Sequence, residues 1–279
     1  MIAVQQLVGT IKRHRRMHRA ARKARFALGR LIPPRRFAGI PGRVHFNDFM
    51  FLNSSPAEVA SYAQRARNVL DLIEEALSLA GRTFDDVEHW LDFGCGYGRV
   101  VRFLVDRVPA HRVFVSDVVG QGVDFCAAEF GVHPVYSRAE LDGISLGSFD
   151  FIYAISVITH LNERNSVAFL RLLGESLTEG GIALFTTHGQ WSIANAGLYG
   201  SEYEAQRSEI AALVQERGIA YLPYEFVDED YGMTWHSREY IERAMAELHG
   251  ARVAPLMFRP HALDGHQDVH AFQRVRRSA

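Results

Sequence analysis

A short glycine-rich stretch carries the residues best suited to bind a ligand through the backbone. Glycine stands at every second position, at Gly94, Gly96 and Gly98, and Asp92 lies two residues before the first of them. Glycine adopts positive φ without strain and lets a ligand approach the backbone closely. An apolar run precedes the stretch, and apolar residues at helical spacing follow it. The turn should therefore deliver a ligand to the amino end of a helix, where free N–H groups point outward.

A second carboxylate, Asp117, stands where a nucleotide-binding unit would need one. It ends the apolar run 112–117, about 20 residues beyond the glycine turn, where a carboxylate can accept hydrogen bonds from ribose hydroxyls. The alternative to a nucleotide-binding unit is a tight turn followed by a surface aspartate that binds no ligand. Nicotinamide and flavin dinucleotides favour Gly-x-Gly-x-x-Gly, which would require glycine where this sequence has Arg99. An oxidoreductase that uses such a cofactor is therefore disfavoured.

The pattern Asp-x-Gly-x-Gly-x-Gly, from Asp92 to Gly98, resembles motif I of the class I S-adenosylmethionine (SAM) methyltransferases. The resemblance extends from about Val87 to the end of the sequence, and it implies SAM as cofactor and methyl transfer as activity. The runs 232–240 and 265–269 resemble, more loosely, bacterial methyltransferases of the small-molecule and glycan-modifying type.

The resemblance also implies where the cofactor would be held. The glycine turn would pass under the methionine moiety, with Asp92 beside its ammonium group. Asp117 would take the ribose, and Val118 would lie under the adenine. The residues after the third strand would touch the adenine edge, and those after the fourth would flank the transferable methyl. The implied set is Asp92, Gly94, Cys95, Gly96, Gly98, Asp117, Val118, Ser137, Arg138, Ile155 and Ser156.

Three of the thirteen histidines fall where a general base would be useful. A hydroxyl acceptor must lose its proton, and histidine is the usual base near neutral pH. His160 follows the fourth strand in a phrase that resembles small-molecule methyltransferases, His188 ends the fifth strand, and His236 precedes the last helix. Each could instead be a structural histidine. Cys95 fits a backbone-contact position better than a nucleophile.

Missing motifs narrow the acceptor. The fourth strand continues as Tyr153-Ala154-Ile155-Ser156, so the Asn/Asp-Pro-Pro-Tyr sequence that binds an exocyclic amine is missing, as is the Pro-Cys pair of cytosine methylation. Paired glutamates and an Asp-rich metal site are missing there too. We therefore expect metal-independent transfer, most plausibly to oxygen of a small molecule, sugar or lipid-linked acceptor. Two alternatives stay open: an RNA methyltransferase, and a non-catalytic binding protein with a methyltransferase-like fold.

Charge is distributed unevenly along the 279 residues. Residues 1–47 contain 12 of the 31 Lys and Arg and no Asp or Glu, so the remainder holds 19 basic and 32 acidic residues. The basic arm, residues 12–36, has a loose helical apolar stripe that ends at two prolines. It could be a solvated extension, a transit peptide, or a contact for an anionic membrane surface or nucleic acid. The acidic remainder disfavours RNA, because it repels phosphate.

Other features bear on location. Only two cysteines occur, no apolar run reaches the roughly 18–20 residues of a spanning helix, and no signal-peptide pattern is visible. We expect a cytoplasmic protein, either free or peripheral to the membrane. The sequence leaves the oligomeric state open.

Apolar runs alternate with helical patterns between residues 87 and 187, which predicts a parallel sheet with right-handed crossovers. Together with the resemblance, this predicts a Rossmann-like doubly wound α/β fold, with a seven-stranded sheet whose last strand is antiparallel, plus an N-terminal helical extension. We expect a basic extension over 1–43 and a methyltransferase domain over 44–279. The excursion at about 189–235 should be a lid that binds the acceptor. A helix capped by Ser55 and Glu58 precedes the sheet.

Overall fold

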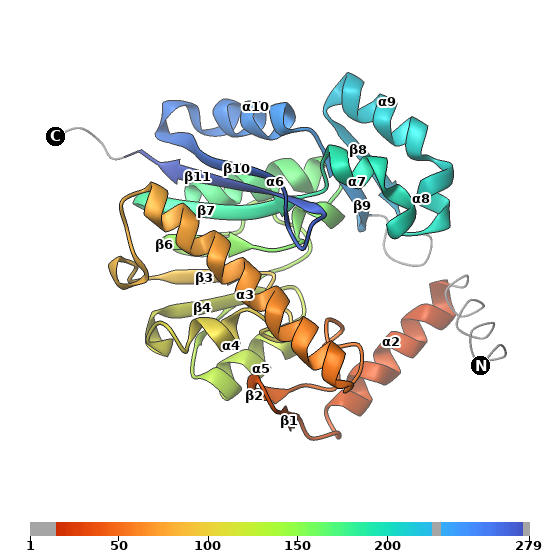
Figure 1. The fold of residues 1–279 in the computed structure, drawn as a ribbon, viewed down its shortest axis with the longest axis vertical. Helices are drawn as coiled ribbons and strands as arrows, with labels where there is room; N and C mark the ends of the chain where they lie inside the picture. Colours follow the sequence, from red (N-terminus) through yellow and green to blue (C-terminus); the bar gives the residue numbers. More distant parts are fainter. Residues whose placement is uncertain (1–14, 225–229, 276–279) are drawn as a thin grey trace.

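The computed structural model describes residues 15–224 and 230–275, and a seven-stranded sheet lies at its centre (Figure 1). All neighbouring strands are parallel except β11, which runs antiparallel to both of its neighbours. The predicted fold class is confirmed. From one edge to the other the strands are β10 (Val253–Leu263), β11 (Gln267–Arg274), β7 (Leu177–Thr187), β6 (Phe149–Ala154), β3 (Trp90–Phe93), β4 (Val113–Asp117) and β5 (His133–Tyr136).

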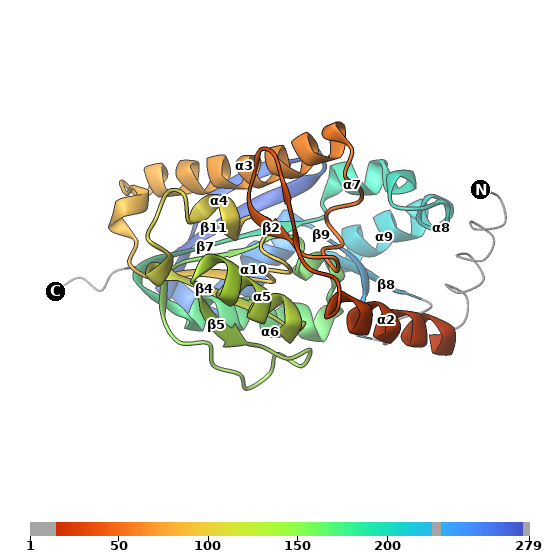
Figure 2. The same ribbon diagram turned by 90° about the horizontal axis from the view of Figure 1, so that it is seen from below.

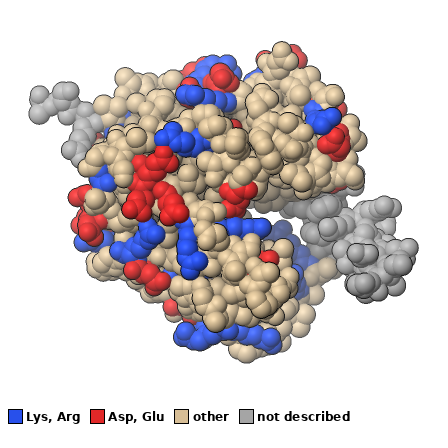
Figure 3. Space-filling view, in the orientation of Figure 1, with Lys and Arg blue, Asp and Glu red and all other residues tan. Residues whose placement is uncertain are grey.

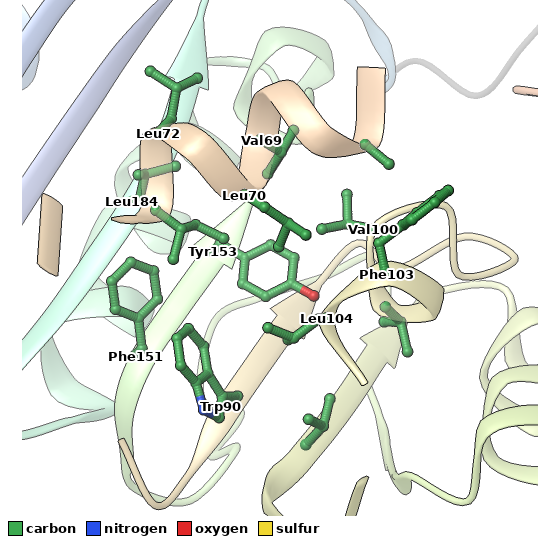
Figure 4. Close-up of a cluster of buried hydrophobic side chains, with 14 of the residues drawn as sticks. Val69, Leu70, Leu72, Trp90, Val100, Phe103, Leu104, Phe151, Tyr153 and Leu184 are labelled. Atoms are coloured by element: carbon green, nitrogen blue, oxygen red, sulfur yellow. The ribbon is translucent and has the colours of Figure 1, made fainter. Parts of the chain in front are cut away.

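Helices cover both faces of this sheet, and each interface is an apolar core. One face packs against α3 (Pro56–Leu79), α4 (Val101–Leu104) and α5 (Gly120–Phe130), and the other against α6 (Glu163–Glu175) and α10 (Arg238–His249). On the first face Trp90 and Phe151 lie on neighbouring strands with ring centroids 5.1 Å apart, beside Tyr153 (Figure 4). Two buried faces explain why β6 and β7 read as nearly continuous apolar runs.

The strand order reverses between β3 and β6, because the chain leaves β3 toward β4 on one side and returns with β6 on the other. Crevices at such reversals, outside the carboxyl ends of the strands, are where open α/β sheets bind ligands. The glycine turn and the segment after β6 meet at this point.

Local sequence signals explain the two best-predicted helices. Helix α3 begins after Ser55, whose side chain accepts a hydrogen bond from the Glu58 amide, and Pro56 occupies its first turn. Helix α10 begins after Ser237, whose side chain accepts from the Tyr240 amide. Helix α3 therefore begins at the cap that the sequence predicts.

The helix after the glycine turn, α4, is short. Only Val101–Leu104 is α-helical, because i→i−3 hydrogen bonds, from Phe103 to Val100 and from Arg107 to Leu104, tighten both ends. The buried Arg102 side chain adds donors there, bonding the carbonyls of Tyr97 and Gly98 and, across the interface, those of Pro41 and Arg43. It thereby ties the N-terminal segment to the glycine turn.

The excursion between β7 and α10 contains several short helices and a hairpin. It forms a small unit with its own apolar core around Trp235. Its elements are α7 (Gln190–Ala194), η4 (Ala196–Leu198), α8 (Ser201–Ala205), α9 (Arg207–Arg217) and the antiparallel hairpin β8 (Ile219–Pro223) and β9 (Gly232–His236). Short 3₁₀ turns elsewhere are η1 (Phe84–Asp86), η2 (Ala110–Arg112), η3 (Ile158–His160) and η5 (Gly250–Arg252).

The N-terminal region contains a helix, α2 (Arg15–Gly29), and a hairpin that the sequence did not predict, β1 (Arg35–Phe37) and β2 (Ile40–Val44). Figure 2 shows α2 on the side of the molecule that also carries β8 and β9. Residues 12–14 of the predicted basic arm lie outside the described residues. Within the described ranges, no helix combines the length and apolar character needed to cross a bilayer.

Candidate active site

The glycine turn between β3 and α4 has the backbone conformation that its sequence predicts. Gly94, Gly96 and Gly98 have φ of +88°, +53° and +77°. A Cβ on Gly94 would lie 2.4 Å from Cγ2 of Val157, whereas a Cβ on Gly96 would meet nothing within 4 Å. The turn is therefore packed tightly against the segment after β6 at one glycine and faces open space at the next, so it forms a cradle that a ligand could enter.

Asp117, at the end of β4, is joined directly to this turn. One carboxylate oxygen accepts a hydrogen bond from the Gly96 amide at 2.8 Å, and the other accepts from the Val119 amide at 2.8 Å. Burial raises the pKa of Asp117, and the backbone hydrogen bonds oppose that shift. The next residue, Val118, keeps 58% of its surface exposed, which is unusual for an apolar side chain beside a buried strand.

Asp92 lies within β3 and is 4% exposed. Burial raises the pKa of its carboxyl to about 8; the Asp117 charge adds to the shift, and the Tyr153 hydroxyl and Arg99 oppose it. Cys95 is also buried, and a hydrogen bond with Cys126 together with burial raises the pKa of its thiol. Such a thiol is a poor nucleophile, because the thiolate is the reactive form.

The candidates after β5 differ from each other. The hydroxyl of Ser137 is buried and has no hydrogen-bond partner among the described residues. The Arg138 side chain folds back on its own loop and donates to the carbonyls of Glu140 and Asp142. The Arg138 side chain thus makes its hydrogen bonds within its own loop, whereas the Ser137 hydroxyl is free to bond a ligand.

The residues after β6 turn sharply toward β7. Ser156 has a φ of +57°, a strained value for a residue with a side chain. Its amide donates to the Thr186 hydroxyl at 2.8 Å, and its own hydroxyl lies 3.0 Å from the Gln267 side chain. These contacts hold the strained turn and leave Ile155 half-buried beside it.

His160 ends the same segment, in η3. Its Nδ1 lies 2.9 Å from the carbonyl oxygen of Gly232 and 3.0 Å from the Tyr224 hydroxyl, and the ring of Tyr231 stacks on it with centroids 5.0 Å apart. A carbonyl only accepts, so Nδ1 carries the proton and Nε2 has the free lone pair. Burial lowers the pKa of His160, and the bond to Gly232 opposes that shift.

The other two candidate bases are more deeply enclosed. His188 is 2% exposed with its Nδ1 3.2 Å from the Thr234 carbonyl, and His236 is 1% exposed with neither ring nitrogen bonded within the described part of the chain. Burial lowers the pKa of both to about 3; the charges of His160 and His266 add to the shift of His188. Of the three histidines, His160 is the one that combines a fixed tautomer with partial exposure.

A segment outside the sequence motifs also lies beside the glycine turn. Residues 45–48 lie across the glycine turn: His45 stacks on Tyr97 with centroids 4.6 Å apart, and the Asn47 amide donates to Gln121 at 2.9 Å. The Tyr97 hydroxyl donates to the same Gln121 oxygen at 2.9 Å. Asn47 is fully buried, and its Oδ1 has no partner among the described residues. The only sequence signal was the aromatic composition of this segment.

A comparison with protein-family models gives a match to the methyltransferase domain over residues 62–253. The match covers more than half of the chain, so the protein belongs to this family. A search of curated protein sequences gives no significant match.

Solved structures with the same fold include two with TM-scores of at least 0.5. One is the SAM-bound amino pentose methyltransferase CalS10 of Micromonospora echinaspora, with 16% identity, a TM-score of 0.51, and coverage of 80% of this chain and 98% of that one. Another is an O-methyltransferase family protein of Burkholderia thailandensis, with 12% identity, a TM-score of 0.50, and coverage of 80% of this chain and 61% of that one. The family match identifies the protein as a methyltransferase, and the two solved structures show that its fold is the Rossmann-like methyltransferase fold.

Proposed function

We propose that this enzyme transfers the methyl group of SAM to a hydroxyl of a small-molecule, sugar or lipid-linked acceptor, without a metal ion and with His160 as general base. The observation that carries the proposal is the position of His160 on the segment whose Val157 packs against Gly94 of the glycine turn. This contact joins the candidate base to the candidate cofactor site. When bound, SAM supplies an electrophilic methyl on a sulfonium that is already a good leaving group.

The cofactor residues would act through backbone and carboxylates. The open space above Gly96 would accommodate the methionine moiety, and the Asp92 carboxylate would face its ammonium group. Asp117 is held by two amides, and each of its oxygens keeps a lone pair for a ribose hydroxyl. The exposed Val118 would lie under the adenine, and the unpaired Ser137 hydroxyl would reach its edge.

The base would work through a fixed tautomer. Because Nδ1 of His160 donates to the Gly232 carbonyl, Nε2 can accept a proton from an acceptor hydroxyl. Its lowered pKa keeps the ring neutral at pH 7. Alignment of the acceptor would be the main task of the protein, since orientation alone can supply on the order of 7–11 kcal/mol. The unit at 189–235, which contributes Gly232 and Tyr231, would be the acceptor lid.

Two measurements test the proposal. Calorimetry with S-adenosylhomocysteine should give binding that Asp117→Asn weakens by roughly 10- to 100-fold, as for the loss of charge-assisted hydrogen bonds. Asp71→Asn, on the exposed face of α3, is the control and should bind normally. Equal affinity in Asp117→Asn would remove this residue from the site.

A methyl-transfer assay with labelled SAM and a fractionated cell extract should then label the small-molecule, glycan or lipid fraction. Labelled RNA would favour the alternative enzyme. Cofactor binding with no transfer to any fraction would favour a non-catalytic binding protein.

A further inference from the structure

Large apolar side chains are exposed together in one part of the N-terminal region. Six of the twelve exposed large apolar residues in the described chain fall between residues 28 and 52. We call these six the apolar patch: Leu28, Leu31, Phe46, Phe49, Met50 and Leu52. Leu31 and Leu52 expose 80% and 72% of their surface. Phe51 is half-buried, whereas the neighbouring Phe46 and Phe49 face outward.

Basic side chains of α2 border this patch. Arg22, Lys23 and Arg25 are exposed, and the guanidinium of Arg25 lies 4.4 Å from the ring centroid of Phe49 and 5.5 Å from that of Phe46. Phe26 contacts Phe49 edge-on, which fixes the helix against the patch. Since residues 1–47 contain no acid, the positive charge is not neutralised within the segment.

The same helix borders the candidate acceptor site. The charge of Arg22 acts on the Tyr231 hydroxyl, and the Tyr231 ring stacks on His160. In Figure 3 the surface is hollowed on this side, and blue Lys and Arg atoms border the lower wall of the hollow. The basic side chains of α2 therefore lie near the Tyr231 ring that stacks on the proposed catalytic base.

We propose that the apolar patch and the α2 cations dock the enzyme on an anionic lipid bilayer and that the methyl acceptor is a lipid-linked molecule drawn from it; the acceptor part rests on the proposed function. Interfacial membrane anchors typically combine exposed Leu and Phe side chains with neighbouring Arg and Lys. Anionic headgroups attract each basic residue near the surface. Nucleic acid would use the cations but would leave Leu31 and Leu52 without a partner.

Vesicle co-sedimentation of the full chain tests the docking. Binding should be strong to vesicles of phosphatidylcholine with phosphatidylglycerol and weak to phosphatidylcholine alone. Arg25→Gln should weaken binding about fivefold, and Leu52→Ser about tenfold. Two matched controls should bind like wild type. One is Arg243→Gln, an exposed arginine that lies over the ring of Tyr240 on α10, which covers the other face of the sheet. The other is Leu79→Ser, an exposed leucine at the end of α3.

Equal binding by Leu52→Ser and wild type would overturn the proposal, as would equal losses in the controls. Salt-sensitive RNA retention by the full chain without anionic vesicle binding would overturn it in favour of nucleic acid. Affinity for S-adenosylhomocysteine, measured on the same variants, should stay at the wild-type value. If the wild-type chain binds S-adenosylhomocysteine but not anionic vesicles, the docking is refuted and the proposed function is not. A variant that loses both kinds of binding is misfolded, and the variants that keep S-adenosylhomocysteine binding then decide the test.

Discussion

The Gly96 amide donates a hydrogen bond of 2.8 Å to the Asp117 carboxylate and so joins the turn after β3 to the end of β4. The two residues are 21 positions apart in the sequence, yet the parallel pairing of their strands places them at one edge of the sheet. Helix α5 packs closely on the same turn, since a Cβ on Gly122 would lie 2.1 Å from the Gly96 carbonyl oxygen. The cradle and the carboxylate are therefore held together by direct hydrogen bonding and close packing.

The tight packing at Gly94 gives the first prediction. Gly94→Ala adds a Cβ 2.4 Å from Val157 Cγ2 at a φ of +88°, so we expect unfolding free energy to fall by about 2–4 kcal/mol and cofactor affinity to fall with it. Gly81→Ala, at a φ of +66° with no atom within 4 Å, should show only the backbone cost of about 1 kcal/mol. Urea unfolding measures both. Removing Cγ2 by Val157→Ala should partly rescue Gly94→Ala; no rescue would mean that the contact is not the cause.

The buried Asp92 predicts proton release on cofactor binding. Its pKa of about 8 keeps the carboxyl mostly protonated at pH 7 in the free protein. An ammonium group beside it would favour the carboxylate, so binding should release up to one proton at this pH. Calorimetry of S-adenosylhomocysteine in buffers with different ionisation enthalpies should give different apparent enthalpies. Asp92→Asn should remove this buffer dependence; its persistence would assign the proton to another group.

The fixed tautomer of His160 predicts that this histidine, and not His188, is the general base. His160→Asn keeps a donor for the Gly232 carbonyl but removes the base, so kcat should fall by about 10²- to 10⁴-fold with unchanged affinity for S-adenosylhomocysteine. His188→Asn is the matched variant, because His188 makes the same kind of bond to the Thr234 carbonyl. A larger loss of kcat in His188→Asn than in His160→Asn would identify His188 as the general base.

The pH dependence of kcat gives an independent test of the same base. His160 must be neutral to act, and its pKa lies below the ordinary 6.5. The rate should therefore be flat through neutral pH and fall only below pH 6.5. A fall that begins above pH 7 would contradict the assignment.

Buried neutral histidines predict acid sensitivity of the fold. The pKa of His236 is about 3 in the folded chain and about 6.5 when unfolded, so the unfolded state binds more protons between these values. The contribution of neutral His236 to the free energy of unfolding is fully present above pH 6.5 and is lost as the pH falls toward 3. At pH 5 the loss is about 2 kcal/mol. His236→Leu should reduce the loss between pH 7 and pH 5 by that amount in urea unfolding. His111→Leu, on the surface, should leave the loss unchanged.

Local signals in the sequence determined much of the fold. The Ser55 and Ser237 caps mark helix starts because side-chain capping depends on a few neighbouring residues. The alternation of apolar runs and helical patterns predicted the parallel part of the sheet, because the direction of a crossover follows from element order. The turn at 94–98 could also be predicted from the sequence, because positive φ at alternate positions strongly favours glycine there.

Only the tertiary structure decided which side chains meet at the site. Gly232 fixes the tautomer of His160 from 72 residues away. The buried Arg102 side chain bonds carbonyls of a distant hairpin, and Phe49 faces outward despite its apolar side chain. Capping and periodicity act between residues a few positions apart, so they can be read along a chain. Tautomer, burial and exposure depend on neighbours that folding brings together, and no local pattern records them.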